Sequence, residues 1–246
     1  SRSFSTGPSP SCAGGARRDP RRKDVRAVMH KTPLYELTNI VCAYEDEPVL
    51  QVDSLAIPDE GPVAFVGHNG SGKSTLLKLL SFLLPQVSGE LRFLGETQDK
   101  KDDARLHATL LLQEPYLLRR SVFENIAYGL RARGEASLRE RVVEALEMVG
   151  LSADFARREW YRLSGGEARR VALASRLALR TRVLLLDEPT ANVDEENAQL
   201  MAEAVLDAWK RWNTTPLIAT HDLQWLDTVT QRRIFMRRGK IERIAL

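Results

Sequence analysis

Cysteine is scarce in this chain, with only Cys12 and Cys42 among its 246 residues. Cys12 lies in a polar N-terminal stretch, whereas Cys42 lies in a segment with the apolar, β-prone character of a strand. Two cysteines placed in this way do not predict a disulfide framework. The scarcity therefore fits a protein of a reducing compartment.

Long apolar runs are also missing from the sequence. No run approaches the ~18 residues that a membrane-spanning helix requires. The N-terminus lacks the continuous apolar core of a secretory signal. We therefore expect a soluble, cytoplasmic chain.

A strong excess of charge of either sign is absent as well. The chain carries 36 Lys and Arg against 33 Asp and Glu, a formal net charge of +3. Residues 1–31 hold much of the basic excess, are rich in Ser, Gly, Pro and Arg, and predict a disordered basic extension. Two other interpretations of residues 1–31 are that the natural chain starts at Met29, and that the segment is a basic tail at a membrane surface. No basic-aromatic motif accompanies the charge, so we expect no nucleic-acid partner.

The sequence does contain a glycine-rich turn at residues 67–75, Gly-His-Asn-Gly-Ser-Gly-Lys-Ser-Thr. It fits the phosphate-loop pattern, between a β-prone run at 62–67 and a Leu-rich run at 75–84 that Pro85 ends. Glycines let backbone N–H groups point at a polyphosphate, and the following helix adds the positive end of its dipole. Lys73 can neutralise the β- and γ-phosphates, and Ser74 can hold Mg²⁺.

Periodicity predicts an α/β protein with a mainly parallel sheet covered on both faces. β-rich segments at 34–43, 49–57, 88–95 and 108–113 precede a largely helical insertion at about 114–162. The insertion predicts helices at 121–133 and 138–149, the second with a capping box of Ser137 and Glu140 and with Gly150 after its end. Helices at 165–180, 195–212 and 223–230 then alternate with strands at 183–186 and 217–220, before a hairpin over 233–244.

The apolar strand at 183–186 runs into two carboxylates, Asp187 and Glu188. In parallel sheets the C-terminal ends of strands face the ligand crevice. Asp187 can therefore reach the Mg²⁺ shell, and Glu188 brings a second carboxylate to the same place. One acid for a metal and one for a water molecule is what nucleotide hydrolysis requires.

Residues 163–167, Leu-Ser-Gly-Gly-Glu, open a second candidate phosphate site. Ser164 and Glu167 have the spacing of a capping box. Gly165 and Gly166 leave the N–H groups of the predicted helix open to an anion. The two phosphate-binding helix ends could serve two sites, or opposite sides of one site in a dimer, and composition does not choose between them.

In order and spacing, these motifs resemble the nucleotide-binding subunit of ATP-binding cassette (ABC) transporters. The resemblance covers residues 34–246 and is carried by residues 67–75, Gln113, 163–167, 183–188, Asp194 and His221. It implies a RecA-like P-loop NTPase core with a mainly parallel sheet, an antiparallel β subdomain and an inserted α-helical subdomain. One ABC ATPase domain would span residues 32–246, with ATP and Mg²⁺ as its ligands.

The resemblance also implies that two copies pair head to tail around ATP. Ser164, Gly165 and Gly166 of one copy would contact the γ-phosphate held by the other, and Asp194 would lie in the loop that crosses the dimer interface. Tyr44 would stack on adenine, a half-buried strand tyrosine being the alternative. The loop residues that would hold ATP in the same copy are Gly67, Asn69, Gly70, Ser71, Gly72, Lys73, Ser74 and Thr75.

Four residues would serve the reaction in this interpretation. Lys73 would hold the phosphates, Glu188 would polarise the attacking water, and His221 would contact the γ-phosphate. Gln113 would touch the metal and the water, and would relay the nucleotide state to a membrane partner. The ligands of Mg²⁺ would be Ser74, Gln113 and Asp187.

The sequence departs from the family pattern beside the second motif. Glu167 stands where the family often has Gln. Ser175 replaces a common Arg, and Arg176 follows one position later, about 100° further round the helix. The contact that the common Arg makes is therefore in doubt here, while the nucleotide motifs themselves are intact.

A single cassette without a span or a C-terminal regulatory extension resembles the ATPase subunit of a bacterial importer. The implied partners are a second copy, membrane permease subunits and, indirectly, a solute-binding protein, with the chain peripheral at the inner face of the cell membrane. Residues 113–129 and 190–194 resemble importers of tungstate and related oxyanions. Alternatives are an exporter ATPase, a soluble ABC ATPase that regulates ribosomes or nucleic acid, and a nucleotide-gated assembly module.

The surface for the permease would lie within residues 114–133. Tyr116, Leu117, Leu118 and Phe123 are its candidate contacts, with packing inside the helical insertion as the alternative for each. The ATPase subunit of such a transporter does not touch the cargo, so its sequence need not encode the solute.

Overall fold

The computed structural model describes residues 32–45, 47–97, 101–191 and 193–246. The predicted N-terminal extension, Cys12, Met29 and Asn192 of the 190–194 segment lie outside these ranges. The described part contains two sheets. The smaller sheet is antiparallel, in the order β2-β1-β4-β5. Its strands are β1 (Tyr35–Tyr44), β2 (Glu47–Ile57), β4 (Ser88–Phe93) and β5 (Glu96–Thr97).

The larger sheet has six strands in the order β10-β9-β3-β8-β7-β6. Its five strands from β9 to β6 are parallel to their neighbours, and β10 adds an antiparallel edge through the predicted C-terminal hairpin. The strands are β3 (Val63–Val66), β6 (Ala108–Leu111), β7 (Val183–Asp187), β8 (Thr215–Thr220), β9 (Arg233–Arg237) and β10 (Lys240–Ala245). The predicted mainly parallel sheet is thus confirmed, together with a separate antiparallel sheet.

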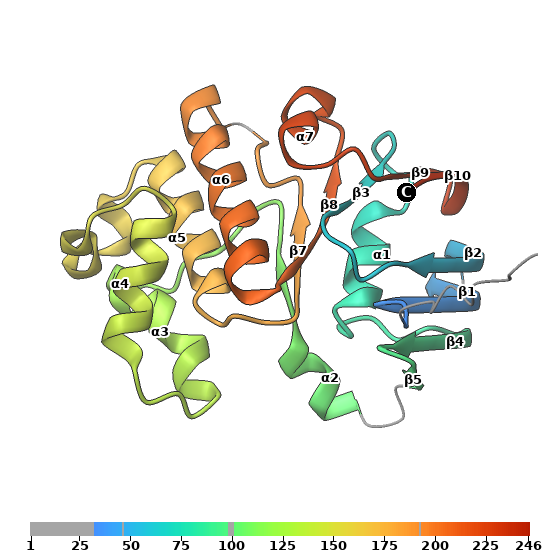
Figure 1. Cartoon of the computed structure of the whole chain (residues 1–246), viewed down its shortest axis with the longest axis horizontal. Coiled ribbons are helices and arrows are strands. Elements are labelled where there is room, and N and C mark those ends of the chain that lie inside the picture. Colours follow the sequence, from blue (N-terminus) through green and yellow to red (C-terminus); the bar gives the residue numbers. More distant parts are fainter. Residues whose placement is uncertain (1–31, 46, 98–100, 192) are drawn as a thin grey trace, which may run out of the picture. The chain divides into compact units, whose positions relative to one another are not determined.

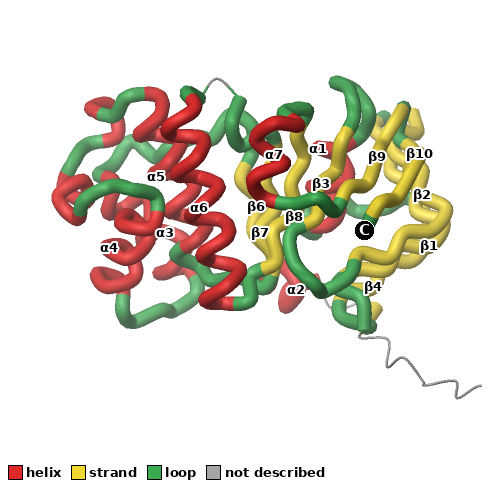
Figure 2. The backbone as a smooth tube through the Cα atoms, turned by 45° about the horizontal axis from the view of Figure 1, so that its top comes forward, coloured by secondary structure: helices red, strands yellow, loops and turns green. Residues whose placement is uncertain are grey.

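The helices divide between the two faces of the larger sheet. Figures 1 and 2 show α3 to α6 on one side of it, with α1 and the antiparallel strands on the other. The α-helices are α1 (Lys73–Leu80), α2 (Lys101–His107), α3 (Val122–Ala132), α4 (Leu138–Met148), α5 (Gly165–Leu177), α6 (Glu195–Trp212) and α7 (Leu223–Val229). Two short 3-10 helices, η1 (Ala153–Arg157) and η2 (Trp160–Arg162), precede α5.

Alternate side chains of the buried strand β7 enter two different cores. Leu184 and Leu186 pack into the cluster that holds the apolar faces of α3, α4, α5 and α6. Val183 and Leu185 pack into the cluster that joins α1 to the antiparallel sheet. Because side chains alternate along a strand, one fully apolar strand can fill both layers. The sheet thereby fixes the strand end at Asp187 between the two layers.

Three local predictions differ from the structure. Ser137 precedes α4, but its side chain makes no capping hydrogen bond, so the predicted capping box with Glu140 is wrong. Its backbone ψ of 57° departs from the extended conformation of a capping residue, which explains the loss. Helix α1 ends at Leu80 rather than near Pro85, because Phe82 turns the chain with a φ of 59°. Helix α2 was not predicted from the polar sequence at 101–107.

Other local features agree with the sequence. Gly150 follows the end of α4 with a φ of 69°, a left-handed conformation that glycine adopts without strain. Cys42 is a buried free thiol, and burial raises its pKa to about 11. No helix in the described ranges is both long and apolar enough to cross a membrane.

Candidate functional site

The glycine-rich turn links β3 to α1 in the strand–loop–helix order that the motif requires. Gly70 and Gly72 have φ values of 75° and 98°, and Gly72 is the N-cap of α1. No side chain caps this helix end. Its first N–H groups and the positive end of its dipole therefore face the loop.

Lys73, the first residue of α1, is buried beneath the loop. Its ammonium donates hydrogen bonds to the carbonyl oxygens of Gly67 at 2.7 Å and His68 at 3.3 Å. It also lies 3.7 Å from Glu188 Oε1. Only 6% of the Lys73 side chain is exposed, so water screens its charge weakly.

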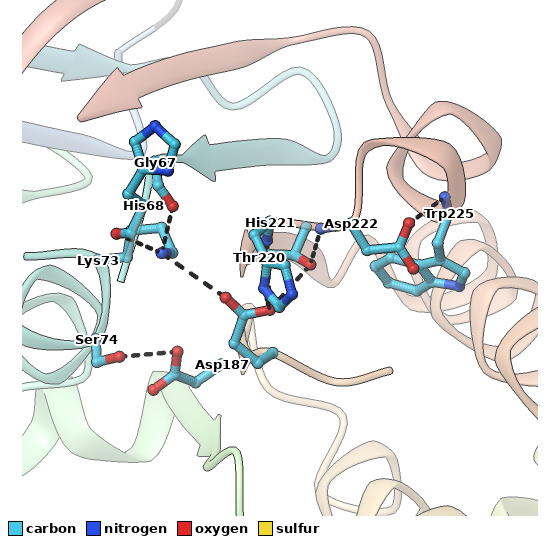
Figure 3. A network of polar contacts seen from close by, with 10 residues as sticks. Gly67, His68, Lys73, Ser74, Asp187, Thr220, His221, Asp222 and Trp225 are labelled. Carbon is cyan, nitrogen blue, oxygen red and sulfur yellow. Dashed lines mark hydrogen bonds and ion pairs between the residues drawn. The ribbon is translucent and has the colours of Figure 1, made fainter. Parts of the chain in front are cut away.

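Ser74 and Asp187 bring α1 and β7 together. The Ser74 hydroxyl donates a 3.0 Å hydrogen bond to Asp187 Oδ1 (Figure 3). Burial raises the pKa of the Asp187 carboxyl above its ordinary value, although the bond from Ser74 acts in the opposite direction. A hydroxyl and a carboxylate held this close are hard oxygen donors of the kind that Mg²⁺ prefers.

Glu188 follows β7 in a left-handed turn with a φ of 46°, uncommon for a residue with a side chain. Its N–H donates to Ala219 of β8 at 2.8 Å, which ties the turn to the next strand. Its Oε2 accepts hydrogen bonds from the Thr220 hydroxyl at 3.1 Å and from the His221 N–H at 3.3 Å. His221 Nδ1 lies 2.9 Å from the same oxygen.

A cavity of about 360 Å³ opens where these elements meet. Gln113, Glu188 and Val49 of β2 line it together with the loop. The predicted loop residues on its surface are Asn69, Gly70, Ser71, Gly72, Lys73, Ser74 and Thr75. Asp187 and His221 join this group through Ser74 and Glu188. The structure thus brings together the phosphate-loop, strand-end and hydrolysis residues predicted from the sequence.

The second predicted motif forms a separate group. Ser164 caps α5, and the capping box with Glu167 forms in both directions, as predicted. A Cβ added to Gly165 would meet nothing within 4 Å. None of residues 164–166 lines the cavity just described. The α5 N-terminus is therefore unobstructed at Gly165, and it does not contribute to the cavity of the phosphate loop in its own copy.

Asn197 joins that helix end to the loop before α6. Its backbone N–H and side-chain amide both donate to the Asp194 carboxylate, at 2.8 Å and 2.6 Å. A Cβ at Gly166 would lie 3.1 Å from the Asn197 side chain, so the two segments pack closely. The hydrogen bond from the Asn197 N–H holds the pKa of Asp194 below its ordinary value. Sequence reasoning missed Asn197, and its spacing of three residues from Asp194 was the available signal.

Three further predicted positions lie away from the cavity lining. Tyr44 ends β1 and is 44% exposed. At the departures from the family pattern, the Ser175 hydroxyl donates to the Ala172 carbonyl at 2.7 Å. Arg176 Nε is buried and has no hydrogen-bond partner among the described residues, and burial lowers the pKa of its guanidinium.

Comparison with known proteins decides the family. The model of the family described as ABC transporter matches residues 50–191. The chain belongs to the ABC transporter family. This cassette is 37% identical over 199 residues to the energy-coupling factor transporter ATP-binding protein EcfA2 of Caldanaerobacter subterraneus, covering 78% of the chain and 70% of that protein. It is 33% identical to the tungstate uptake system ATP-binding protein TupC of Peptoclostridium acidaminophilum, covering 83% and 95%.

Solved cassettes share the fold. The ATP-binding cassette MJ0796, in a dimeric post-hydrolysis state bound to ADP and Pi, superposes with a TM-score of 0.77 at 27% identity, covering 86% of this chain and 97% of that one. The cbiO1 protein of Clostridium perfringens, part of a cbiONQ complex, gives 0.77 at 25% identity, covering 86% and 88%. The predicted P-loop NTPase fold is confirmed, and the cassette is an ATP-binding ATPase.

The donor set of the cavity fits these ligands. An uncapped helix end and the Lys73 ammonium suit a polyphosphate. Ser74 and Asp187 offer oxygen donors 3.0 Å apart, and Gln113 adds an amide to the cavity lining. Oxygen donors of these types suit Mg²⁺.

Proposed function

We propose that this cassette hydrolyses ATP at a site shared by two copies paired head to tail, and thereby drives a separate membrane permease. The observation that carries the proposal is the division of the motifs. The phosphate loop and Glu188 line one cavity, whereas the α5 N-terminus lies outside its lining and is open. A second copy can bring its own α5 N-terminus to the γ-phosphate. The dimeric state named for the similar cassette supports this pairing.

Within one copy, the loop from Gly67 to Thr75 would hold the phosphates, with Lys73 as the charged contact. Tyr44 would stack on adenine. From the second copy, Ser164, Gly165 and Gly166 would donate to the γ-phosphate, and Asp194 would border the interface. These segments already pack together through Asn197, so they would approach the nucleotide as one unit.

Ser74, Asp187 and Gln113 would hold Mg²⁺, which when bound offsets phosphate charge. In the hydrolytic step, the oxygen of the attacking water bonds to the γ-phosphorus while Glu188 accepts a proton from that water. The bond between the γ-phosphorus and the bridging oxygen breaks, and ADP and phosphate leave. His221, whose side chain is 64% exposed, would donate to the γ-phosphate from the far side of Glu188.

We further propose that the permease belongs to an importer and works with a solute-binding protein. Similar proteins named for tungstate uptake, Fe(3+) import and energy-coupling factor transport support this direction. The TupC protein, matched over nearly its whole length, supports tungstate or a related oxyanion as the solute. The cassette would then be peripheral at the inner face of the cell membrane.

The permease surface would centre on the loop before α3. Tyr116 is 88% exposed and Leu118 is also exposed, whereas Leu117 and Phe123 pack against the helical core. The first two residues are therefore the proposed contacts. Ile244, an exposed apolar side chain on β10, lies outside residues 114–133 and offers a control.

The test is isolation of the tagged full-length chain from membranes of its source organism. A polytopic permease should co-purify with the wild type and with Ile244→Ala, and should be lost with Tyr116→Ala. In proteoliposomes, a binding protein loaded with tungstate should stimulate ATP hydrolysis. If the cassette sediments with ribosomes and no permease is found, the regulatory alternative is favoured. If solute on the ATPase side of the membrane stimulates ATP hydrolysis, an exporter is favoured.

A further inference from the structure

Thr220, the last residue of β8, lies behind the hydrolytic carboxylate and was not singled out by any motif. Its side chain is fully buried. Its hydroxyl donates to Glu188 Oε2 at 3.1 Å and accepts the N–H of Asp222 at 3.0 Å. Figure 3 shows Thr220 between Asp222 and the group around Lys73. The residue thus connects the strand end of β8 to the residue that polarises water.

The direction of these two hydrogen bonds is fixed by chemistry. A hydroxyl has one proton and two lone pairs, and a backbone N–H can only donate. The Asp222 N–H therefore occupies a lone pair of Thr220 Oγ1. The only acceptor bonded to that oxygen among the described residues is Glu188, so the hydroxyl proton points at the carboxylate.

This arrangement gives the two oxygens of Glu188 different surroundings. Oε2 is held by the Thr220 hydroxyl and the His221 N–H, and lies beside the His221 ring. Oε1 faces Lys73, at 3.7 Å, on the side of the cavity. One oxygen is therefore anchored in the protein, and the other is presented to the place where the nucleotide phosphates bind.

We infer that Thr220 is a positioning residue for ATP hydrolysis: its hydroxyl anchors Oε2 of Glu188, so that Oε1 faces the attacking water. The inference rests on the proposed role of Glu188. Thr220 touches neither nucleotide nor water in this arrangement and acts only through Glu188. Small displacements of a reacting group cost large factors in rate, so the anchor matters to turnover more than to binding.

Thr230 provides a matched control at the other end of α7. Its hydroxyl accepts the N–H of the residue two positions ahead, Arg232, at 3.1 Å, as Thr220 accepts that of Asp222. Its proton goes to the Pro62 carbonyl at 2.7 Å instead of to a carboxylate. Both threonines are buried. Replacing either threonine by Val removes one hydrogen bond accepted from the N–H two positions ahead and one donated by the hydroxyl. Only the change at Thr220 removes a hydrogen bond to Glu188.

The experiment compares full-length Thr220→Val, Thr220→Ser and Thr230→Val with the wild type, using Mg²⁺ and ATP. Thr220→Val should lower kcat about 10- to 100-fold, the range expected for one hydrogen bond to a charged group. The KM for ATP and the Kd for a fluorescent ATP analogue should change less than about threefold, because the lost contact serves the transition state. Thr220→Ser keeps the hydroxyl and should restore kcat. Thr230→Val should lose a similar amount of thermal stability while retaining kcat.

Equal kcat values for Thr220→Val and Thr230→Val would overturn the inference, as would a Thr220→Ser variant as slow as Thr220→Val. If Thr220→Val does not fold, Thr220→Ala serves as the hydroxyl-free variant in the same comparison. A Glu188→Gln variant with wild-type turnover would mark a different failure, because it would remove the role of Glu188 on which the inference depends.

Discussion

The Ser74 hydroxyl donates a 3.0 Å hydrogen bond to Asp187, although 113 positions of sequence separate the two residues. The contact sets a hydroxyl from the first turn of α1 against the carboxylate that ends β7. The contact brings the phosphate-loop motif and the acidic end of β7 together in one oxygen-rich corner of the site. This corner is where we propose that Mg²⁺ binds.

Asp187→Asn should separate metal binding from folding. Asparagine keeps the shape and an oxygen that accepts from Ser74, but it removes the charge. Because burial raises the pKa of Asp187, the ionised carboxylate is costly in the folded state, and the thermal midpoint without Mg²⁺ should not fall. The Mg²⁺ concentration for half-maximal hydrolysis should rise at least about tenfold. Asp53→Asn, at an exposed position of β2, is the control and should leave both quantities unchanged.

Glu188→Gln should bind ATP yet turn it over very slowly. Glutamine fills the same space but does not accept the proton of the attacking water. The expected loss in kcat is about 10²- to 10⁴-fold, the usual contribution of a general base. Equilibrium binding of a fluorescent ATP analogue and steady-state phosphate release measure the two effects. Glu203→Gln, at an exposed position further along α6, should behave as the wild type. Rapid release by Glu188→Gln would contradict the assignment.

Local sequence signals were sufficient where local interactions set the structure. Helix α6 begins at Glu195 and ends at Trp212, as predicted, because Asp194 caps it and its apolar period is regular. The capping box of Ser164 and Glu167 forms for the same reason. Tertiary contacts between separate segments could not be predicted from the sequence. Phe82 ends α1 early and lies in an aromatic cluster with Phe93 and with Tyr35, which is distant in sequence.

The same distinction holds at the site. The glycine-rich loop and the Asp-Glu pair were predictable because each motif encodes its own geometry. Val49 and Thr220 were not, since their roles depend on which strands become neighbours. Nothing within the sequence around Thr220 indicates that its hydroxyl faces Glu188, because the pairing of β7 with β8 creates that contact.

Glu167→Gln tests the departure from the family pattern through pH. The Ser164 N–H donates to the Glu167 carboxylate at 2.8 Å and is the main reason why the pKa of Glu167 lies below its ordinary value. The folded state therefore binds this proton less readily than the unfolded state. The resulting stabilisation is present above the unfolded-state pKa of about 4.3 and is lost as the pH falls through the folded-state value.

Glutamine can keep the bond from Ser164 but has no proton to gain in this range. Glu167→Gln should therefore lose less thermal stability than the wild type between about pH 5 and pH 3. The difference should be small, because the hydrogen bonds of this carboxylate to Ser164 and Arg158 lie at the protein surface, where water screens them. Thermal midpoints measured across this range decide the matter, and parallel curves for the two proteins would refute the expectation.

Mixing two inactive variants tests whether the site is shared between copies. Lys73→Ala damages the phosphate loop, and Gly165→Asp places a bulky anion at the open α5 N-terminus, where a Cβ meets nothing within 4 Å. Each variant alone should fold and hydrolyse almost no ATP. In a mixed head-to-tail dimer both lesions fall in one site and the other site is intact. Random mixing of equal amounts should therefore restore about one quarter of wild-type activity, since half of the dimers are mixed and each has one working site.

Mixing Lys73→Ala with Glu188→Gln is the control, because both residues serve the site of their own copy and both sites of a mixed dimer stay damaged. Absence of recovery in the first mixture, with mixed dimers demonstrated by cross-linking in the presence of ATP, would exclude the shared site.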